Sequence, residues 1–87
     1  IRVKDFDHAI RLSNMSNFGL GVTICTRNPE KALARVNEFD EGAVFINELV
    51  KSDPRLPFGG IKRSGFGREL SSEGIHEFVN VKTVYVK

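Results

Sequence analysis

The sequence predicts an α/β fold with parallel strands, and three observations lead to this prediction. Residues 22–26 and 43–47 are two apolar runs without strict alternation, as expected of strands that are covered on both faces. A segment with the apolar spacing of a helix separates them, and another precedes the first run. The order strand, helix, strand implies parallel pairing through a right-handed crossover.

The first helix is predicted from its start signal. Residues 2–3 read as the end of a strand, and Asp5 then stands where a helix N-cap is expected. Apolar residues recur behind it at helical spacing until about Asn17, and Gly19 is suited to the C′ position just beyond the helix. The next predicted strand, residues 22–26, follows.

The second helix has a stronger start signal. Asn28 can act as the cap, Pro29 is preferred at the first helical position, and the acid that follows lies near the positive end of the helix. Gly42 is predicted to end this helix before the strand 43–47. The residues expected to form its buried stripe are Ala32, Leu33, Val36 and Phe39.

The C-terminal third begins with a long loop, residues 48–68, and loops of that length in a compact domain are usually functional. Ser71 or Ser72 is predicted to cap a short helix that runs through Phe78. Residues 79–86 alternate in the manner of a final strand. Such strands would leave open sheet edges, so we expect self-association or exchange of elements.

The most informative segment is residues 57–69, which are rich in glycine, aromatic and basic residues. Glycine gives up the most backbone freedom on ordering, so a chain concentrates it where the backbone must turn sharply or be approached closely. The segment is therefore predicted to be a shaped, functional loop. Its glycines are Gly59, Gly60, Gly65 and Gly67, and they are interleaved with Phe58, Phe66, Lys62, Arg63 and Arg68.

The pattern Pro-Phe-Gly-Gly-x-Lys-x-Ser-Gly-x-Gly-Arg-Glu in this segment resembles the signature near the C-terminus of NAD(P)-dependent aldehyde dehydrogenases. Residues 41–47 resemble the strand Gly-x-Val-x-Val-Asn of that family, and residues 77–84 resemble its closing segment. The resemblance extends over essentially the whole chain and is greatest to the succinate-semialdehyde branch. Family members are several times longer than 87 residues, so we expect the chain to be part of a longer protein.

The resemblance implies a fold and a domain arrangement. Residues 1–78 would be the C-terminal part of an open, mainly parallel αβα catalytic domain, and residues 79–87 would form a closing strand used for oligomerisation. The longer protein is thus expected to be a homo-oligomer. Its expected location is the cytoplasm, since no apolar run approaches the ~20 residues of a membrane span and a single cysteine fits a reducing compartment.

The resemblance also implies a reaction. The longer protein would oxidise an aldehyde, with succinate semialdehyde as the expected substrate, using NAD or NADP and a cysteine thioester. The nucleophile of the family sits in a glycine-rich context that Cys25 lacks, so Cys25 is predicted to be buried and inert. Since the cofactor fingerprint is missing as well, the 87 residues alone are expected to bind no cofactor and to be inactive.

Two residues are the candidates for contact with the substrate. Phe58 is either a hydrophobic plug that pins the loop or, as the resemblance implies, a wall of the tunnel that leads to the catalytic cysteine. Ser52 is either a turn serine that bonds its own backbone or, as in the succinate-semialdehyde branch, a ligand of the distal carboxylate of the substrate.

The other candidate residues are assigned to the structure of the loop. The amide of Asn47 is expected to satisfy loop backbone, and Arg68 and Glu69 are expected to fasten the loop. No metal site is predicted from the side chains, although in some members of the family that the chain resembles, the backbone carbonyls that match Lys62 and Gly65 contribute to a site for a monovalent cation. His8 and His76 lack metal-ligand spacing and are expected at the surface. The remaining loop residues are Gly59, Gly60, Ser64 and Gly67.

Composition leaves two alternative functions open. The net charge of +2 gives no global field that favours nucleic acid or a membrane. Residues 51–68, however, carry five cations against Asp53 alone, so the loop could bind an anion. The other alternative is a non-catalytic assembly piece that associates through exposed strands.

Overall fold

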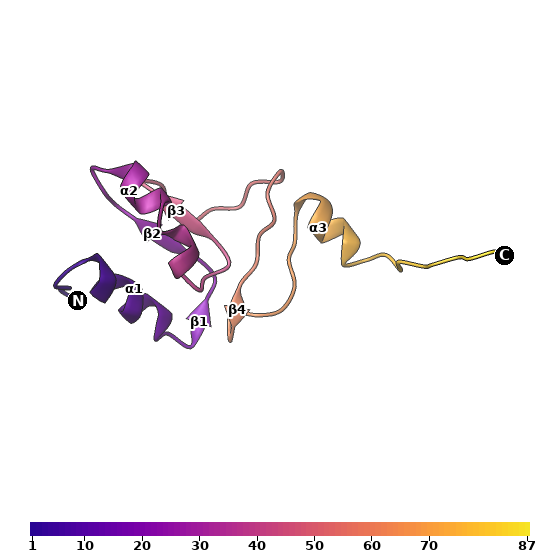
Figure 1. Ribbon diagram of the computed structural model, residues 1–87, viewed down its shortest axis with the longest axis horizontal. Coiled ribbons are helices and arrows are strands. Elements are labelled where there is room, and N and C mark those ends of the chain that lie inside the picture. Colours follow the sequence, from indigo (N-terminus) through magenta and orange to yellow (C-terminus); the bar gives the residue numbers. More distant parts are fainter.

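The computed structural model describes residues 1–87, an elongated molecule of 61 × 26 × 24 Å (Figure 1). Most helices and strands form an N-terminal lobe, from which a long connection leads to the last helix and an extended tail (Figure 1). The elements are α1 (Phe6–Asn14), β1 (Phe18–Gly19), β2 (Val22–Ile24), α2 (Pro29–Leu33), the 3₁₀ helix η1 (Val36–Glu38), β3 (Val44–Ile46), β4 (Ile61–Lys62) and α3 (Ser71–His76).

Strands β2 and β3 are parallel, with Val22 opposite Val44 and Ile24 opposite Ile46, and α2 lies between them in the chain. The mixed α/β class and the parallel pairing predicted from the sequence are therefore confirmed. The core is small: Ile10 of α1, Ile24, Ala32 of α2 and Phe39 are its buried apolar side chains. It fills the space between the two helices and one face of the sheet.

The start of α1 was predicted correctly and its end was not. The side chain of Asp5 accepts a hydrogen bond from the amide of His8 and caps the helix. The helix stops at Asn14, and Gly19 is not its C′ residue, because Gly19 belongs to β1 and pairs antiparallel with Ile61 of β4. This pairing joins residues far apart in the chain, so no local pattern reveals it.

The predicted second helix is two shorter elements. Asn28 caps α2 as expected, with its side chain accepting from the amide of Lys31. The helix ends at Leu33, because Arg35 leaves the helical conformation (φ −122°, ψ 11°). Ala32 and Phe39 are buried as predicted, but Leu33 is 63% exposed, which contradicts its place in the buried stripe.

The C-terminal helix also starts differently from the prediction. Leu70, with φ 65°, occupies the N-cap position, and neither Ser71 nor Ser72 caps α3. Both serine hydroxyls instead hydrogen-bond the side chain of Glu73 within the first turn. The helix ends at His76, two residues before Phe78. No helix of the chain is both long and apolar enough to cross a membrane.

Residues 79–87 form no strand in this structure and extend away from the rest of the molecule (Figure 1). Their alternating pattern is real, but a strand requires a hydrogen-bonding partner, and none of the chain's own segments supplies one. Val81, Val84 and Tyr85 are consequently at least 77% exposed. Residues 2–3 likewise lie outside any strand.

Candidate functional site

The glycine-rich loop is closed at its base by backbone hydrogen bonds. Phe58 and Glu69 face each other in an antiparallel bridge, and each amide donates to the carbonyl of the other at 2.8 Å. Within the segment 48–68 that was predicted as loop, Ile61 and Lys62 form β4 against β1. The loop is therefore an ordered hairpin-like excursion that docks on the segment between α1 and β2.

Two glycines show why this loop needs them. A Cβ atom at Gly59 would lie 2.6 Å from the carbonyl oxygen of Gly67, so the two backbone segments pack closer than any side chain permits. Gly67 itself has φ 70°, a conformation that side-chain-bearing residues rarely adopt. These two glycines thus let the loop pack closely on itself.

Arg68 ties the two sides of the loop together. Its guanidinium donates to the carbonyl of Gly60 at 3.0 Å and to that of Gly67 at 2.8 Å. Glu69 contributes its backbone to the bridge with Phe58, and its side chain is exposed. The side chain of Arg68 and the backbone of Glu69 therefore each hold one part of the loop against another, the structural role expected for both residues.

Lys62 attaches the loop to the N-terminal lobe. Its Nζ donates to the carbonyl of Asn14 at 2.8 Å and to that of Ser16 at 3.1 Å, and it lies 3.3 Å from the carboxylate of Asp40. Lysine at this place satisfies carbonyls at the C-terminal end of α1, where a cation is also favoured by the helix dipole. Sequence reasoning missed this role of the side chain, because the partners lie up to 48 residues away.

A second attachment involves Ser64, whose hydroxyl accepts a hydrogen bond from the amide of Gly19 at 2.9 Å. Next to it, the amide of Arg63 donates to the carbonyl of Asn17 at 3.0 Å. Gly65 follows with φ 137°, and no atom of the chain lies within 4 Å of the place where a Cβ atom would stand. The monovalent-cation site at the carbonyls of Lys62 and Gly65 stays a prediction.

Phe58 is half-buried and borders two hollows of the surface. One hollow, of about 490 Å³, runs along β3 and is also bordered by Glu48, Lys51 and Asp53. The other, of about 400 Å³, lies within the glycine-rich loop and reaches Glu77 of the C-terminal segment. The ring therefore separates a space beside the sheet from a space inside the loop.

Ser52 is exposed, and its hydroxyl makes no hydrogen bond within the chain. The alternative in which Ser52 bonds its own backbone in a turn is therefore wrong for this structure. Its two neighbours, Lys51 and Asp53, border the hollow beside Phe58, whereas Ser52 does not. The structure thus brings the two substrate-contact candidates to the same region without joining them in one cavity.

Asn47 stands at the carboxyl end of β3 with φ 56°, a conformation that asparagine tolerates better than most residues. Its side-chain oxygen accepts from the amide of Thr26 at 2.8 Å, and its side-chain nitrogen donates to the carbonyl of Thr26 at 2.9 Å. Asn47 therefore satisfies loop backbone, the contact expected from its sequence position, and it joins the ends of the two parallel strands.

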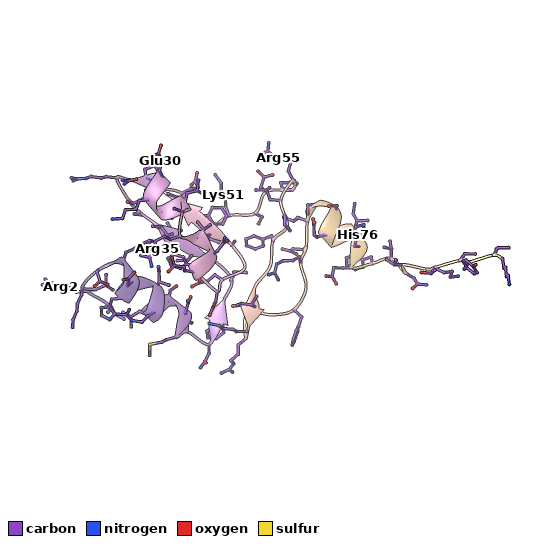
Figure 2. The ribbon with its side chains drawn as sticks, viewed as in Figure 1. Arg2, Glu30, Arg35, Lys51, Arg55 and His76 are labelled. Atoms are coloured by element: carbon purple, nitrogen blue, oxygen red, sulfur yellow. The ribbon has the colours of Figure 1, made fainter.

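The positive charge of residues 51–68 is largely compensated within the chain. Lys51 pairs with Glu48 at 2.8 Å, and Arg55 pairs with Asp53 at 2.6 Å, on the segment that leads away from β3 (Figure 2). The hydrogen bond from Lys51 lowers the pKa of Glu48, and the one from Arg55 lowers the pKa of Asp53. Arg63 and Arg68 form no ion pair: Arg68 donates to backbone carbonyls, and the guanidinium of Arg63 lies 5.9 Å from the centre of the Phe18 ring.

Cys25 is exposed, which contradicts the prediction that it is buried. The strand β2 ends at Ile24, so Cys25 lies just beyond it, at the edge of a hollow of about 270 Å³ that Phe6 also borders. His76 is exposed on α3 (Figure 2), as predicted, whereas His8 is half-buried and accepts from the amide of Lys4. The chain contains no group of three or more His, Cys, Asp or Glu side chains that could hold a metal ion.

The loop does not fit a dinucleotide. The carboxylate of Glu77 stands beside Gly67, and its Oε1 accepts from the amide of Arg68 at 3.4 Å, so a negative charge already occupies that side of the loop. Gly65 and Gly67 also precede the irregular Leu70, not a helix that continues directly from a strand. This loop therefore lacks the strand, turn and helix arrangement of a dinucleotide fingerprint.

Comparison with known proteins agrees with the resemblance noted in the sequence. The family model described as the aldehyde dehydrogenase family matches residues 1–84. A probable succinate-semialdehyde dehydrogenase [NADP(+)] of Synechocystis sp. is 56% identical over 97% of this chain, and a succinate semialdehyde dehydrogenase [NAD(P)+] of Escherichia coli is 50% identical over 94% of it. The chain spans 18% of the length of each of these relatives.

Solved structures give the same result at the level of the fold. The crystal structure of succinic semialdehyde dehydrogenase from Streptococcus pyogenes, in complex with NADP+, superposes with a TM-score of 0.89 at 48% identity, over 97% of this chain and 18% of that one. A betaine aldehyde dehydrogenase from Staphylococcus aureus superposes with a TM-score of 0.81 at 36% identity, over 87% and 15%. The chain therefore belongs to the aldehyde dehydrogenase family.

Proposed function

We propose that the chain is the C-terminal part of a longer NAD(P)-dependent dehydrogenase that oxidises succinate semialdehyde to its carboxylate. The observation that carries this proposal is the identity of 46–56% to relatives named succinate-semialdehyde dehydrogenase, over at least 94% of the chain. The structure of a betaine aldehyde dehydrogenase is less similar, at 36% identity. An aldehyde that carries a distal carboxylate is therefore the substrate to test first.

Within that protein, Phe58 would form a wall of the substrate tunnel. Its place at the border of the hollow along β3 supports this role, because an aromatic wall orients an aldehyde and keeps water away from a reactive intermediate. Ser52 would contribute a hydroxyl to the carboxylate pocket. Its hydroxyl is free to do so, since the side chain is exposed and forms no hydrogen bond within the chain.

The reaction itself would depend on groups outside these residues. In the mechanism that family membership suggests, a cysteine thiolate adds to the aldehyde and the resulting thioester is hydrolysed. When bound, NAD(P)+ supplies the hydride acceptor. Cys25 lies just beyond β2 and borders a different hollow from Phe58, and it is not assigned as this nucleophile. We accordingly expect no dehydrogenase activity from the 87 residues alone.

The direct test is an assay of the longer protein with succinate semialdehyde, butanal and betaine aldehyde, each with NAD+ and with NADP+. The proposal requires the largest kcat/KM for succinate semialdehyde, with either cofactor. A larger value for butanal or betaine aldehyde would refute the substrate assignment, and no NAD(P)H formation with any aldehyde would refute the enzymatic proposal. The purified 87-residue chain serves as the negative control.

A specific observation also favours a role in assembly. Residues 79–87 are extended, unpaired and rich in exposed valine, so they are suited to form a strand with another subunit. We propose that they form this closing strand and that residues 1–78 belong to the catalytic domain. Removal of residues 79–87 from the longer protein should lower its oligomeric mass in light scattering, and an unchanged mass would contradict the assignment.

The anion-binding alternative gains no such support, because most of the loop cations are already paired with carboxylates or carbonyls. We also propose that the longer protein acts in the cytoplasm, where the free thiol of Cys25 is stable in its reduced form.

A further inference from the structure

The segment between the two proposed substrate contacts, Ser52 and Phe58, is short and has little freedom. Only residues 53–57 separate them. Pro54 and Pro57 each have a fixed φ, and each also restricts the backbone of the residue before it. The separation between the two contacts is therefore set by how these few residues are bent.

Asp53 bends the segment into a turn. Its carbonyl accepts from the amide of Leu56 at 2.9 Å, which closes a β-turn with Pro54 at the second position. Its carboxylate accepts from the amide of Arg55 at 2.9 Å and from the guanidinium of the same residue at 2.9 and 2.6 Å. The Arg55 side chain is 85% exposed, and ion pairs of such residues contribute little to stability. The effect of these bonds is thus on the shape of the turn.

The turn is also anchored from outside, by the residues that follow the glycine-rich loop. The amide of Ser71 donates to the carbonyl of Pro54 at 3.1 Å, and Phe58 is held by its backbone bridge to Glu69. Leu70 and Ser71 have φ 65° and 52°, which side-chain-bearing residues rarely adopt. Backbone strain of this kind persists only where surrounding contacts impose it, and it is frequent at ligand sites.

We propose that Asp53 is a positioning residue: by bending residues 53–56 it sets the separation between the hydroxyl of Ser52 and the ring of Phe58, and thereby the length of aldehyde that the longer protein accepts. This rests on the proposed function, in which Ser52 binds the distal carboxylate and Phe58 forms a wall of the tunnel. The place of Asp53 supports it, because Asp53 adjoins Ser52 in the chain and borders the hollow of about 490 Å³ beside Phe58.

The consequence is selection among semialdehydes by their length. Succinate semialdehyde and its five-carbon homologue, glutarate semialdehyde, carry the same two end groups and differ by one methylene. One extra methylene in a pocket is worth about 10–200-fold in kcat/KM. The longer protein should therefore favour succinate semialdehyde over glutarate semialdehyde by about tenfold or more.

The test measures kcat/KM of the longer protein for both semialdehydes, with one preparation of each variant. Asp53→Ala removes the three side-chain hydrogen bonds and should reduce the ratio of the two values to about threefold or less. Asp53→Asn keeps an oxygen for the amide of Arg55 but loses the ion pair, so its ratio should lie between the two. The fraction of folded protein cancels in this ratio, so a merely structural role of Asp53 would leave it unchanged.

The matched control is Glu48→Ala. Its carboxylate also pairs with a cation, Lys51, and accepts from a backbone amide, that of Leu49. Glu48 borders the same hollow as Asp53 but lies outside the turn. The ratio in this variant should equal that of the unaltered protein, so the control separates the loss of a negative charge at the hollow from the loss of the turn.

Three outcomes would overturn the inference alone: an unaltered protein that does not distinguish the two lengths, a ratio that Asp53→Ala leaves unchanged, or an equal fall in Glu48→Ala. No activity toward either semialdehyde would refute the proposed function, and the inference with it. If Asp53→Ala does not fold, Asp53→Asn and Arg55→Ala, which removes the same ion pair, decide the question. Unchanged ratios in both of these variants would contradict the role of Asp53.

Discussion

The side-chain amide of Asn47 and the backbone of Thr26 form a two-way hydrogen-bonded pair that joins the carboxyl ends of β2 and β3. The backbone amide of Thr26 donates to Oδ1 of Asn47 at 2.8 Å, and Nδ2 of Asn47 donates to the carbonyl of Thr26 at 2.9 Å. The backbone of Thr26 lies beyond the last ladder pairing, Ile24 with Ile46, so the asparagine continues the sheet with its side chain.

Replacement of Asn47 should therefore destabilise the longer protein, and by different amounts for different residues. Asn47→Gly loses both hydrogen bonds but keeps φ 56° without strain, at a cost of about 1–3 kcal/mol. Asn47→Ala adds a left-handed backbone penalty of about 1–2 kcal/mol. Thermal or denaturant unfolding measures both, and Asn37→Ala, on the exposed face of η1, is the control. A smaller effect for alanine than for glycine would contradict this account.

The attachment of the loop by Lys62 leads to a second prediction. Lys62→Met removes two hydrogen bonds and the ion pair with Asp40, and it should cost about 1–3 kcal/mol of unfolding free energy. Arg63→Met removes the neighbouring cation, which has no ion pair, and should stay within about 0.5 kcal/mol. Denaturant unfolding of the two variants compares them directly. Similar losses would mean that net charge, and not the attachment, determines the effect.

The cluster around Arg35 predicts a dependence of stability on pH. Arg35 contacts Glu38 and Asp7 and lies 5.1 Å from the centre of the Phe6 ring, between the two helices (Figure 2). Its hydrogen bonds lower the pKa of Glu38 below the ordinary value of about 4.3. The contribution of Glu38 to stability is therefore fully present above that ordinary value, and it disappears as the pH falls through the lowered one.

The measurement is a series of thermal midpoints between pH 6 and pH 3 at low salt. Glu38→Gln should make the decline of Tm with falling pH shallower, because the variant has no carboxylate to protonate at this position. Glu30→Gln should leave the slope unchanged, because Glu30 is exposed and forms no ion pair. A slope that stays the same in the Glu38 variant would show that this pair contributes nothing to the acid response.

The residues that sequence reasoning placed correctly are those whose contacts are local. Asp5 and Asn28 cap helices through bonds to amides three residues ahead, so the pattern that predicts the cap contains both partners. Lys62 shows the opposite case: Asn14 is 48 residues away, and nothing in either neighbourhood indicates that they meet. The pairing of Gly19 with Ile61 was missed for the same reason, and with it the true end of α1.

Sequence reasoning failed for a different reason at Cys25 and at residues 79–86. Their apolar patterns are those of strands in a sheet, but the chain does not contain the segments that would cover or pair with them. An apolar run predicts burial only if something covers it. Here β2 ends at Ile24, the sheet has two strands, and the final segment has no neighbour. The patterns are typical of a larger sheet than these 87 residues can build, in keeping with a chain that spans 18% of its relatives.

Phe58 provides a prediction that separates its two proposed roles. If the ring is a tunnel wall, Phe58→Leu in the longer protein should lower kcat/KM by about ten- to a hundredfold, as expected for the loss of about 1–3 kcal/mol in an apolar pocket, and should change Tm little. If the ring only plugs the loop, Tm should fall and kcat/KM per folded molecule should be maintained. Parallel unfolding and activity measurements on one preparation distinguish these outcomes.

Ser52 gives the sharpest test of substrate choice. If its hydroxyl donates to the distal carboxylate, Ser52→Ala removes a hydrogen bond to a charged group, worth about 1.5–3 kcal/mol, and KM for succinate semialdehyde should rise about ten- to a hundredfold. KM for butanal, which has a similar length and no charge, should stay nearly constant. An equal rise for both aldehydes would remove Ser52 from the carboxylate pocket. The paired cations Lys51 and Arg55 would not then take its place, because Glu48 and Asp53 already compensate them, so the carboxylate would have to be bound by residues outside this chain.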